Sequence, residues 1–257
     1  MAETAPIIQF RDIKKAFGSK VIYDGLNLDV YPGETLTIIG GSGVGKSVML
    51  KMLVGLLTPD AGSIKAFDKQ LAGMSDEKGW LEMRRRIAML FQSGALFDSM
   101  TVEDNIRFPL IEHGWGTPAE MNDRVAEVLE MVGVPGTQKL LPNELSGGMR
   151  KRVGLARSIA IQPEVILYDE PTTGLDPINV RRINGLILSL QERLGVTSMV
   201  VTHDMDSVFT VTDRLAMVYN HQIAFVGTPD EAKTGPLAYL REFISGGRGT
   251  LGDDVKF

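Results

Sequence analysis

The stretch Gly40-Gly41-Ser42-Gly43-Val44-Gly45-Lys46-Ser47 directly follows the apolar run at residues 34–39 and fits the pattern G-x-x-x-x-G-K-[ST]. Its glycines permit a tight backbone path that turns successive N–H groups inward, as the binding of phosphate oxygens requires. Residues 47–54 are expected to form a helix, whose N-terminal dipole favours the same negative charge. In this setting the pattern predicts a site for a nucleoside triphosphate, the alternative being a plain turn between a strand and a helix.

Within this loop, Lys46 is expected to reach the β- and γ-phosphates and Ser47 to ligate Mg²⁺. The backbone and side chains around them would enclose the rest of the triphosphate. The predicted nucleotide-binding residues of this segment are Gly40, Gly41, Ser42, Gly43, Val44, Gly45, Lys46, Ser47 and Val48.

Two further strand-like runs end in residues that suit the chemistry of a triphosphate. Residues 165–170 read Val-Ile-Leu-Tyr-Asp-Glu, which is short enough for a buried parallel strand. Asp169 suits the surroundings of a Mg²⁺ ion, and Glu170 suits a base that orients or deprotonates the attacking water. Residues 198–202 form a similar run that ends at His203.

Taken singly, each of these residues has a plainer interpretation. Carboxylates after a strand are usually a solvated strand end, and a lone histidine is more often structural than catalytic. In an open parallel sheet, however, ligands bind outside the carboxyl ends of the strands. We therefore expect Asp169, Glu170 and His203 to lie together with the loop at residues 40–47.

The composition is that of an ordinary globular protein of 257 residues, 44% hydrophobic and 23% charged. Cysteine is absent, and the histidines are His113, His203 and His221, so disulfides and thiolate-bound metals are excluded. The first residues lack the basic and apolar regions of a secretory signal, and no run approaches the roughly 18 apolar residues of a membrane span. We expect a cytoplasmic protein whose association with any membrane depends on a partner.

The net charge is −5, and the basic clusters at residues 84–86 and 150–152 are short. Both clusters are expected to be solvated faces of helices. Because the chain carries no extended basic patch, nucleic-acid binding is not expected.

The first half of the chain predicts a small sheet followed by helices. Short β-like stretches at residues 7–13 and 21–30 precede the loop and indicate an antiparallel layer. From about residue 76 to residue 161 the segments are mainly helical around one strand at 87–91. Thr101 and Thr117-Pro118 are typical helix starts within this region.

The second half has the rhythm of a parallel sheet. Strands at 165–169 and 198–202 alternate with an amphipathic segment at 178–194. Two final strands, at 214–219 and 222–226, precede a helix that begins near Thr228 with a capping box.

Within the helical region stands Leu145-Ser146-Gly147-Gly148-Met149, which leads into a helical stretch at 150–161. Ser146 is a predicted helix N-cap, and the two glycines leave the backbone open to a group that approaches closely. By itself the segment is only a capped helix. Placed between the loop at 40–47 and Asp169-Glu170, it resembles the nucleotide-binding subunit of ABC transporters, whose signature LSGGQ it matches at four of five positions.

The resemblance covers residues 7 to 244 and implies roles for further residues. Phe17 stands 29 residues before Lys46, where the family has an aromatic residue that stacks on adenine; many members have Tyr, so the hydroxyl is lost here. Gln92 is similar to the glutamine that senses Mg²⁺ and the attacking water. Gly174-Leu175-Asp176 resembles a loop that crosses the dimer interface, and His203 resembles the histidine that touches the γ-phosphate.

The site implied by the family is shared between two subunits. Each ATP lies between the P-loop of one copy and the signature segment of the other, so a homodimer is expected to hydrolyse ATP to ADP and phosphate. The expected catalytic residues are Glu170, His203, Gln92 and Lys46, and the expected Mg²⁺ ligands are Ser47, Gln92 and Asp169. The further nucleotide contacts are expected from Phe17, Ser146, Gly147, Gly148 and Asp176.

The family also implies the fold and domain organisation. We expect an α/β P-loop NTPase of the ABC type at residues 1–246, with an antiparallel β subdomain and a helical insertion. The RecA-like core would comprise about 7–92 and 162–244, and the helical subdomain about 93–161. Residues 247–257 are expected to be a disordered tail.

A finer resemblance rests on Phe91-Gln-Ser-Gly-Ala-Leu-Phe-Asp-Ser-Met100, on Phe108-Pro-Leu110 and on Met149 in place of Gln. These segments are similar to the ATPases of Mla/Mce-type systems, which move phospholipids or other lipids between bacterial membranes. That likeness implies MlaE-like permease subunits, an Mce-domain lipid-binding protein, and in some systems a small STAS-type regulatory subunit. It places the chain on the cytoplasmic face of the bacterial inner membrane.

Other functions remain open at this point. The alternatives are the ATPase of another ABC importer or exporter, a soluble ABC ATPase that acts outside transport, a P-loop kinase and a non-catalytic cassette. The apolar residues Leu96 and Phe97 in the loop after Gln92 have two interpretations as well. They pack on the chain's own helical insertion, or, with Phe108, they form the floor of a groove that receives a cytoplasmic helix of the permease.

Overall fold

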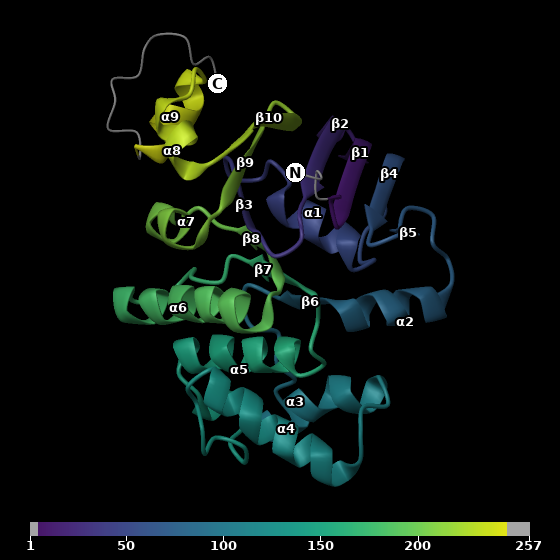
Figure 1. Cartoon of the computed structure of the whole chain (residues 1–257), viewed down its shortest axis with the longest axis vertical. Helices are drawn as coiled ribbons and strands as arrows, with labels where there is room; N and C mark the ends of the chain where they lie inside the picture. The colour runs from purple at the N-terminus through teal and green to yellow at the C-terminus, as the bar shows by residue number, and fades with distance from the viewer. Residues whose placement is uncertain (1–4, 246–257) are drawn as a thin grey trace.

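The computed structural model describes residues 5–245, so the expected tail at 247–257 lies outside the described residues. The strands are β1 (Ile8–Phe17), β2 (Lys20–Val30), β3 (Thr35–Ile39), β4 (Ala61–Ala66), β5 (Lys69–Gln70), β6 (Ile87–Leu90), β7 (Val165–Asp169), β8 (Thr197–Val201), β9 (Arg214–Tyr219) and β10 (Gln222–Gly227). The helices are α1 (Lys46–Leu53), α2 (Glu77–Arg86), α3 (Val102–Glu112), α4 (Pro118–Met131), α5 (Gly147–Ile159), α6 (Pro177–Leu194), α7 (Met205–Val211), α8 (Pro229–Thr234) and α9 (Ala238–Ile244), with a short 3₁₀ turn at Pro142–Glu144. Figure 1 shows their arrangement.

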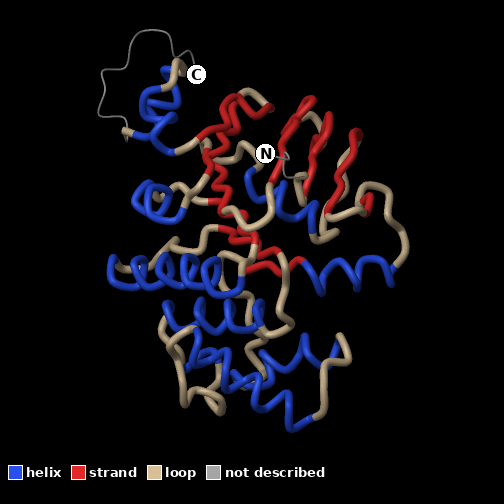
Figure 2. Tube along the Cα trace, in the orientation of Figure 1, coloured by secondary structure: helices blue, strands red, loops and turns tan. Residues whose placement is uncertain are grey.

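Within the described range the strands form two sheets. The antiparallel sheet has the order β2-β1-β4-β5, and the larger sheet has the order β10-β9-β3-β8-β7-β6. The larger sheet is parallel from β9 to β6, and β10 pairs antiparallel at its edge. In Figure 2 the helices between β6 and β7, which are α3, α4 and α5, gather at one end of the molecule, away from the antiparallel sheet. The predicted parallel sheet, antiparallel layer and helical insertion are thus confirmed.

The antiparallel sheet is larger than the sequence predicted. β1 continues to Phe17 rather than ending at residue 13, and a two-residue turn with Gly18 at φ 60° joins it to β2. β4 and β5 were not predicted, because their short run includes Gly62, a residue of low strand propensity. The extension of β1 matters for the site, since it carries Phe17 to the tip of a hairpin.

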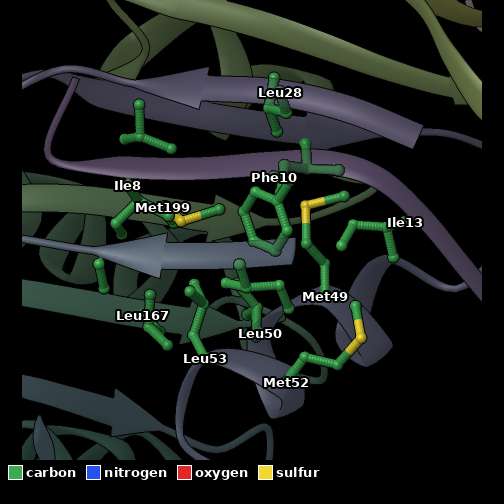
Figure 3. Packing of buried hydrophobic residues seen from close by; sticks show 14 of the residues in the cluster. Ile8, Phe10, Ile13, Leu28, Met49, Leu50, Met52, Leu53, Leu167 and Met199 are labelled. Carbon is green, nitrogen blue, oxygen red and sulfur yellow. The ribbon is translucent and has the colours of Figure 1, made fainter. Parts of the chain in front are cut away.

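The first helix is held between the two sheets. Met49 and Leu50 of α1 are fully buried, in one cluster with Phe10 of β1 and Met199 of β8 (Figure 3). Each such side chain contributes about 1.5–3 kcal/mol when it is removed from water. This packing fixes the N-terminus of α1 directly beyond the carboxyl end of β3.

The helical segments share a core with the other face of the larger sheet. Val128 of α4 and Val153 of α5 belong to one buried cluster with Tyr168 of β7 and Val200 of β8. The predicted N-caps are confirmed: Thr101 accepts from the backbone N–H of Asp104, and Thr117 and Glu120 form a capping box before α4. The helices are therefore anchored to the strands that carry the candidate site.

Candidate active site

The loop between β3 and α1 takes the path expected of a P-loop. Gly40 and Gly45 have φ angles of 146° and 105°, which side chains rarely tolerate. A Cβ on Gly40 would lie 2.6 Å from the carbonyl oxygen of Val218, and one on Gly45 would collide with the side chain of Ile22. The hydroxyl of Tyr23 donates to the carbonyl oxygen of Gly45 at 2.5 Å. The adjacent strands thus force glycine at both positions.

Lys46 begins α1 and bends back over this loop. Its ammonium donates to the carbonyl oxygens of Gly40 at 2.8 Å and Gly41 at 3.0 Å. Burial lowers the pKa of Lys46, and the charges of Glu170 and Asp169 oppose that shift. The ammonium is therefore held at the loop by main-chain oxygens alone, which a phosphate can replace with a stronger, charge-assisted partner.

Ser47 and Asp169 form the next contact across the site. The Ser47 hydroxyl donates to a carboxylate oxygen of Asp169 at 2.6 Å, which joins the start of α1 to the end of β7. Asp169 is 7% exposed. Two hard oxygen donors at the end of a parallel strand match the ligand chemistry that Mg²⁺ prefers.

Glu170 follows β7 in a constrained conformation. Its φ of 51° lies in the left-handed region, where a residue with a Cβ costs free energy and is often found at functional sites. Its backbone N–H donates to the carbonyl oxygen of Val201 at 2.9 Å. Its carboxylate accepts from the hydroxyl of Thr173 at 3.0 Å and lies 2.8 Å from Nδ1 of His203. The carboxylate and the imidazole therefore meet, as the fold rule predicted.

A pocket of about 420 Å³ gathers most of the predicted residues. Its lining consists of Ile22, Ser42, Gly43, Gly45, Lys46, Ser47, Val48, Gln92, Glu170 and His203. Of the remaining loop residues, Gly40 is buried and Gly41 and Val44 are partly buried, and Asp169 lies behind Ser47. Apart from Ile22 of β2, these residues follow the carboxyl ends of β3, β6, β7 and β8, since these strands run parallel and end at one edge.

Phe17 lies at the tip of the β1–β2 hairpin and does not line this pocket. Its ring is exposed to 47%, with the ammonium of Lys15 5.3 Å from its centroid. Lys20 pairs with Phe17 across the turn, and its ammonium lies 3.5 Å from the position that a Cβ on Gly43 would take. The hairpin tip therefore stands beside the P-loop, with an aromatic face open to a ligand.

The signature segment and Asp176 lie outside the pocket of their own chain. Ser146 caps α5 by accepting from the N–H of Met149 at 3.2 Å, as predicted. Asp176 caps α6, accepting from the N–H groups of Ile178 and Asn179 at 2.9 and 3.0 Å. Within one chain Ser146 and Asp176 cap helices, and neither is among the residues that line the pocket.

The expectation that both signature glycines are open is half wrong. A Cβ on Gly147 would meet nothing within 4 Å, whereas one on Gly148 would lie 2.8 Å from the amide of Asn179. Because Gly148 has no side chain, α5 can approach α6 closely within the same chain. Only Gly147 offers free space to an incoming group.

The expectation that residues 150–152 form a solvated helix face is wrong for Lys151, which is buried. It is 6% exposed, and its ammonium donates to the carbonyl oxygens of Pro171 at 2.9 Å and Thr173 at 2.6 Å. Arg152 is partly buried and donates to the carbonyl oxygen of Gly133, while Arg150 stays exposed. Sequence reasoning missed Lys151 because a lysine within a basic triplet carries no signal of burial. The first cluster, at residues 84–86, is largely exposed as expected.

A second pocket of about 400 Å³ lies over β6, α3 and α5. Phe97 and Phe108, 42% and 40% exposed, contribute two tilted rings whose centroids are 5.0 Å apart. Leu96, expected as part of its floor, packs instead against the core of the helical region. Each of the two interpretations of the apolar loop after Gln92 therefore holds for one residue. Leu96 packs on the chain's own helical region, and Phe97 lines the groove.

Comparison with known proteins gives the family of the chain. Residues 23–173 match the model of the family described as "ABC transporter". The chain belongs to this family. It is 39% identical over 241 residues, 94% of its own length and 69% of the relative's, to the "Probable ribonucleotide transport ATP-binding protein mkl" of Mycobacterium leprae. It is 38% identical over 242 residues, 94% of its length and 90% of the relative's, to the "Intermembrane phospholipid transport system ATP-binding protein MlaF" of Escherichia coli K12.

Among solved structures, the ATP-binding cassette MJ0796, a dimer in a post-hydrolysis state bound to ADP and Pi, superposes with a TM-score of 0.79. It is 29% identical and covers 86% of this chain and 98% of its own. The chain is thus an ATP-binding ATPase of the ABC family. No described helix is both long and apolar enough to span a bilayer.

Proposed function

We propose that this chain is the ATP-hydrolysing subunit of an ABC transporter that moves phospholipids between bacterial membranes. The observation that carries the proposal is the match to MlaF, which covers nearly the whole of both chains, whereas the match to mkl leaves almost a third of that relative without a counterpart. The segments 91–100 and 108–110 and the residue Met149 support the same subgroup.

The pocket residues take complementary roles in the proposed mechanism. The ammonium of Lys46 leaves the carbonyl oxygens of the loop for the β- and γ-phosphates, and the loop N–H groups hold the same oxygens. Phe17 stacks on the adenine. The oxygens of Ser47 and Asp169, with Gln92 at the end of β6, fit Mg²⁺, which would neutralise charge on the phosphates.

Glu170 acts on the water in this proposal. Its carboxylate accepts the water's proton or orients it for in-line attack, and a positioned base of this kind contributes about 10²–10⁴-fold. His203, 2.8 Å from that carboxylate, joins the base to the γ-phosphate and senses its presence. The hydroxyl of Thr173 donates to the same carboxylate oxygen and helps to hold it in place.

A second copy completes the site in this proposal. Ser146, Gly147, Gly148 and Asp176 do not line the pocket of their own chain, and α5 begins at an exposed Gly147, where a Cβ would meet nothing within 4 Å. A two-fold dimer places the N-terminus of this helix at the γ-phosphate held by the partner, where its dipole favours the anion. The dimeric relative MJ0796 supports this arrangement.

The proposed partners lie at the membrane. The aromatic groove at Phe97 and Phe108 would receive a cytoplasmic helix of an MlaE-like permease, which holds the chain on the cytoplasmic face of the bacterial inner membrane. An Mce-domain lipid-binding protein and a STAS-type regulatory subunit complete the proposed system. Nucleic acid has no part in it.

Lipid transport is tested by purifying the complex that the tagged chain forms in its native membrane. We expect permease subunits and bound phospholipids by mass spectrometry, and ATP-dependent transfer of a fluorescent phospholipid after reconstitution. The name of mkl favours a second candidate, ribonucleotide transport, so uptake of a labelled ribonucleotide by the same proteoliposomes is measured in parallel. Ribonucleotide uptake without lipid transfer would overturn the proposed cargo and leave the ATPase assignment intact.

A further inference from the structure

A buried lysine outside the pocket holds the backbone of the segment that follows β7. The ammonium of Lys151 donates to the carbonyl oxygens of Thr173 at 2.6 Å, Pro171 at 2.9 Å and Glu170 at 3.3 Å. An ammonium has three donors and is costly to bury unless they are satisfied. Three acceptors from one four-residue turn satisfy all of them, so the lysine and the turn fix one another.

The turn held by Lys151 carries Glu170 in a conformation that needs support. Glu170 has a φ of 51°, and such a backbone persists only where its surroundings determine it strongly. The hydrogen bond from its N–H to Val201 holds one side of the residue. The carbonyl on its other side is held by Lys151.

Lys151 also fixes the residue that orients the carboxylate. The Thr173 hydroxyl donates to Oε2 of Glu170 at 3.0 Å, and the carbonyl oxygen of Thr173 is the shortest acceptor of the lysine. Removing the ammonium therefore releases the turn at both ends of the Glu170–Thr173 contact. A displacement of about 1 Å in a catalytic group can cost about 10²-fold in rate.

We propose that Lys151 is a positioning residue, which holds the carboxylate of Glu170 in line with the attacking water and ties it to α5. The inference rests on the proposed role of Glu170. Because Ser146 caps α5 five residues before Lys151, the same side chain makes a rigid link from the signature segment of one composite site to the base of the other. Lys151 touches neither the nucleotide pocket nor its lining other than Glu170.

The test is the substitution Lys151→Met, which keeps the volume and removes the ammonium. We expect kcat for ATP hydrolysis to fall about 10- to 100-fold, as for a misplaced catalytic group, while the Kd for ATP changes less than about threefold. Lys151→Arg restores charge and donors, and should regain most of the lost kcat. If the methionine variant does not fold, Lys151→Gln replaces it. Its amide supplies two donors in place of three and no charge, so an intermediate loss of kcat is expected.

Arg124→Met is the matched control. Arg124 is 4% exposed and donates to the carbonyl oxygens of Ile159 and Ala160 at the other end of α5, so it is also a buried cation on main-chain acceptors. Its loss should lower the melting temperature comparably and leave kcat within about twofold of wild type. Equal kcat values for the two methionine variants would overturn the positioning role.

The double variant Lys151→Met/Glu170→Gln separates this inference from the proposed function. If Lys151 acts through Glu170, the double variant turns over like Glu170→Gln alone, within about threefold, rather than showing the product of both losses. If the double variant instead loses kcat by the product of the two single losses, the inference is overturned. Wild-type turnover by Glu170→Gln alone would instead overturn the proposed base, whatever Lys151→Met shows.

Discussion

Glu170 is constrained at both its backbone and its carboxylate. Its left-handed φ, its N–H bond to Val201 and its contacts with Thr173 and His203 leave little freedom for the side chain. Preorganisation of this kind keeps the cost of reorientation out of the chemical step. The carboxylate faces the same pocket as Lys46 and Ser47, where the γ-phosphate is proposed to bind.

We expect Glu170→Gln to bind ATP and to hydrolyse it at least about 10²-fold more slowly, because the amide cannot accept the proton of the water. The variant should accumulate as a closed dimer. Phosphate release and sedimentation velocity are measured on the same sample. Glu192→Gln, an exposed carboxylate of α6, is the control and should behave as wild type. Unchanged turnover in Glu170→Gln would remove Glu170 from the role of base.

Residues with a motif were found from the sequence, and residues with only a tertiary role were not. Lys46, Glu170 and His203 follow buried strands, so the rule for parallel sheets was enough to bring them together. Lys151 and Gly148 act through neighbours that lie 19 to 31 residues away along the chain, and no local pattern records such contacts. The exposure of Phe97 and the partial burial of Leu96 next to it depended on packing in the same way.

At the scale of the elements, α5 joins the candidate site to the helical region. Its N-terminal turn is open at Gly147, its middle packs into the core around Val153, and Lys151 reaches the turn after β7. Gly148 lets the helix approach Asn179 of α6, whose amide is bound to the carboxylate of Asp176. The two signature glycines therefore differ in what they do for the free subunit.

That difference predicts a lower stability for alanine at Gly148 than for alanine at Gly147. Gly148→Ala places a Cβ 2.8 Å from the Asn179 amide, which must give up its bond to Asp176, at a cost of about 1 kcal/mol. We expect a melting temperature about 2–4 °C below that of Gly147→Ala, since about 1 kcal/mol corresponds to this shift for a chain of this size. Both variants gain the same helix propensity, so the comparison isolates the contact. Equal melting temperatures of the two variants, measured by circular dichroism, would contradict the proposed contact between Gly148 and Asn179.

Elements with strong periodicity or caps were predictable, and those fixed by long-range pairing were less so. Thr117-Pro118 indicated the start of α4, and the apolar spacing of residues 178–194 indicated α6. Both helices begin within one residue of the expected position. The extension of β1 to Phe17 and the presence of β4 arise from pairing between strands that are far apart in the chain. Such pairing depends on partners rather than on local propensity.

At the scale of the whole molecule, the division of the site between two chains has a direct test. Lys46→Ala damages the P-loop side of a composite site, and Ser146→Arg blocks the signature side by filling the open N-terminus of α5. Mixing the two variants forms heterodimers with one intact site and one doubly damaged site. We expect ATPase activity to return in the mixture above the sum of the separate variants. Absence of both activity and an ATP-dependent heterodimer would argue against a shared site.

The aromatic groove makes a prediction about coupling to the membrane partner. Phe97 is 42% exposed beside Phe108, and Arg157 holds the loop by donating to the carbonyl oxygen of Ala95 at 2.9 Å. An aromatic anchor at an interface typically contributes about 2 kcal/mol or more. We expect Phe97→Ala to stay folded and to bind ATP, while it weakens co-purification with the permease and uncouples ATP hydrolysis from lipid transfer.

Ile111→Ala is the matched control for this prediction, because Ile111 is 64% exposed on α3 and does not line the groove. Pull-down from detergent-solubilised membranes and a circular-dichroism melt are measured for both variants. A large drop in melting temperature for Phe97→Ala alone would show that Phe97 serves the chain's own packing. If permease binding is unchanged in both variants, the coupling helix must dock elsewhere, because the loss of an exposed anchor ring from its groove cannot leave the affinity intact.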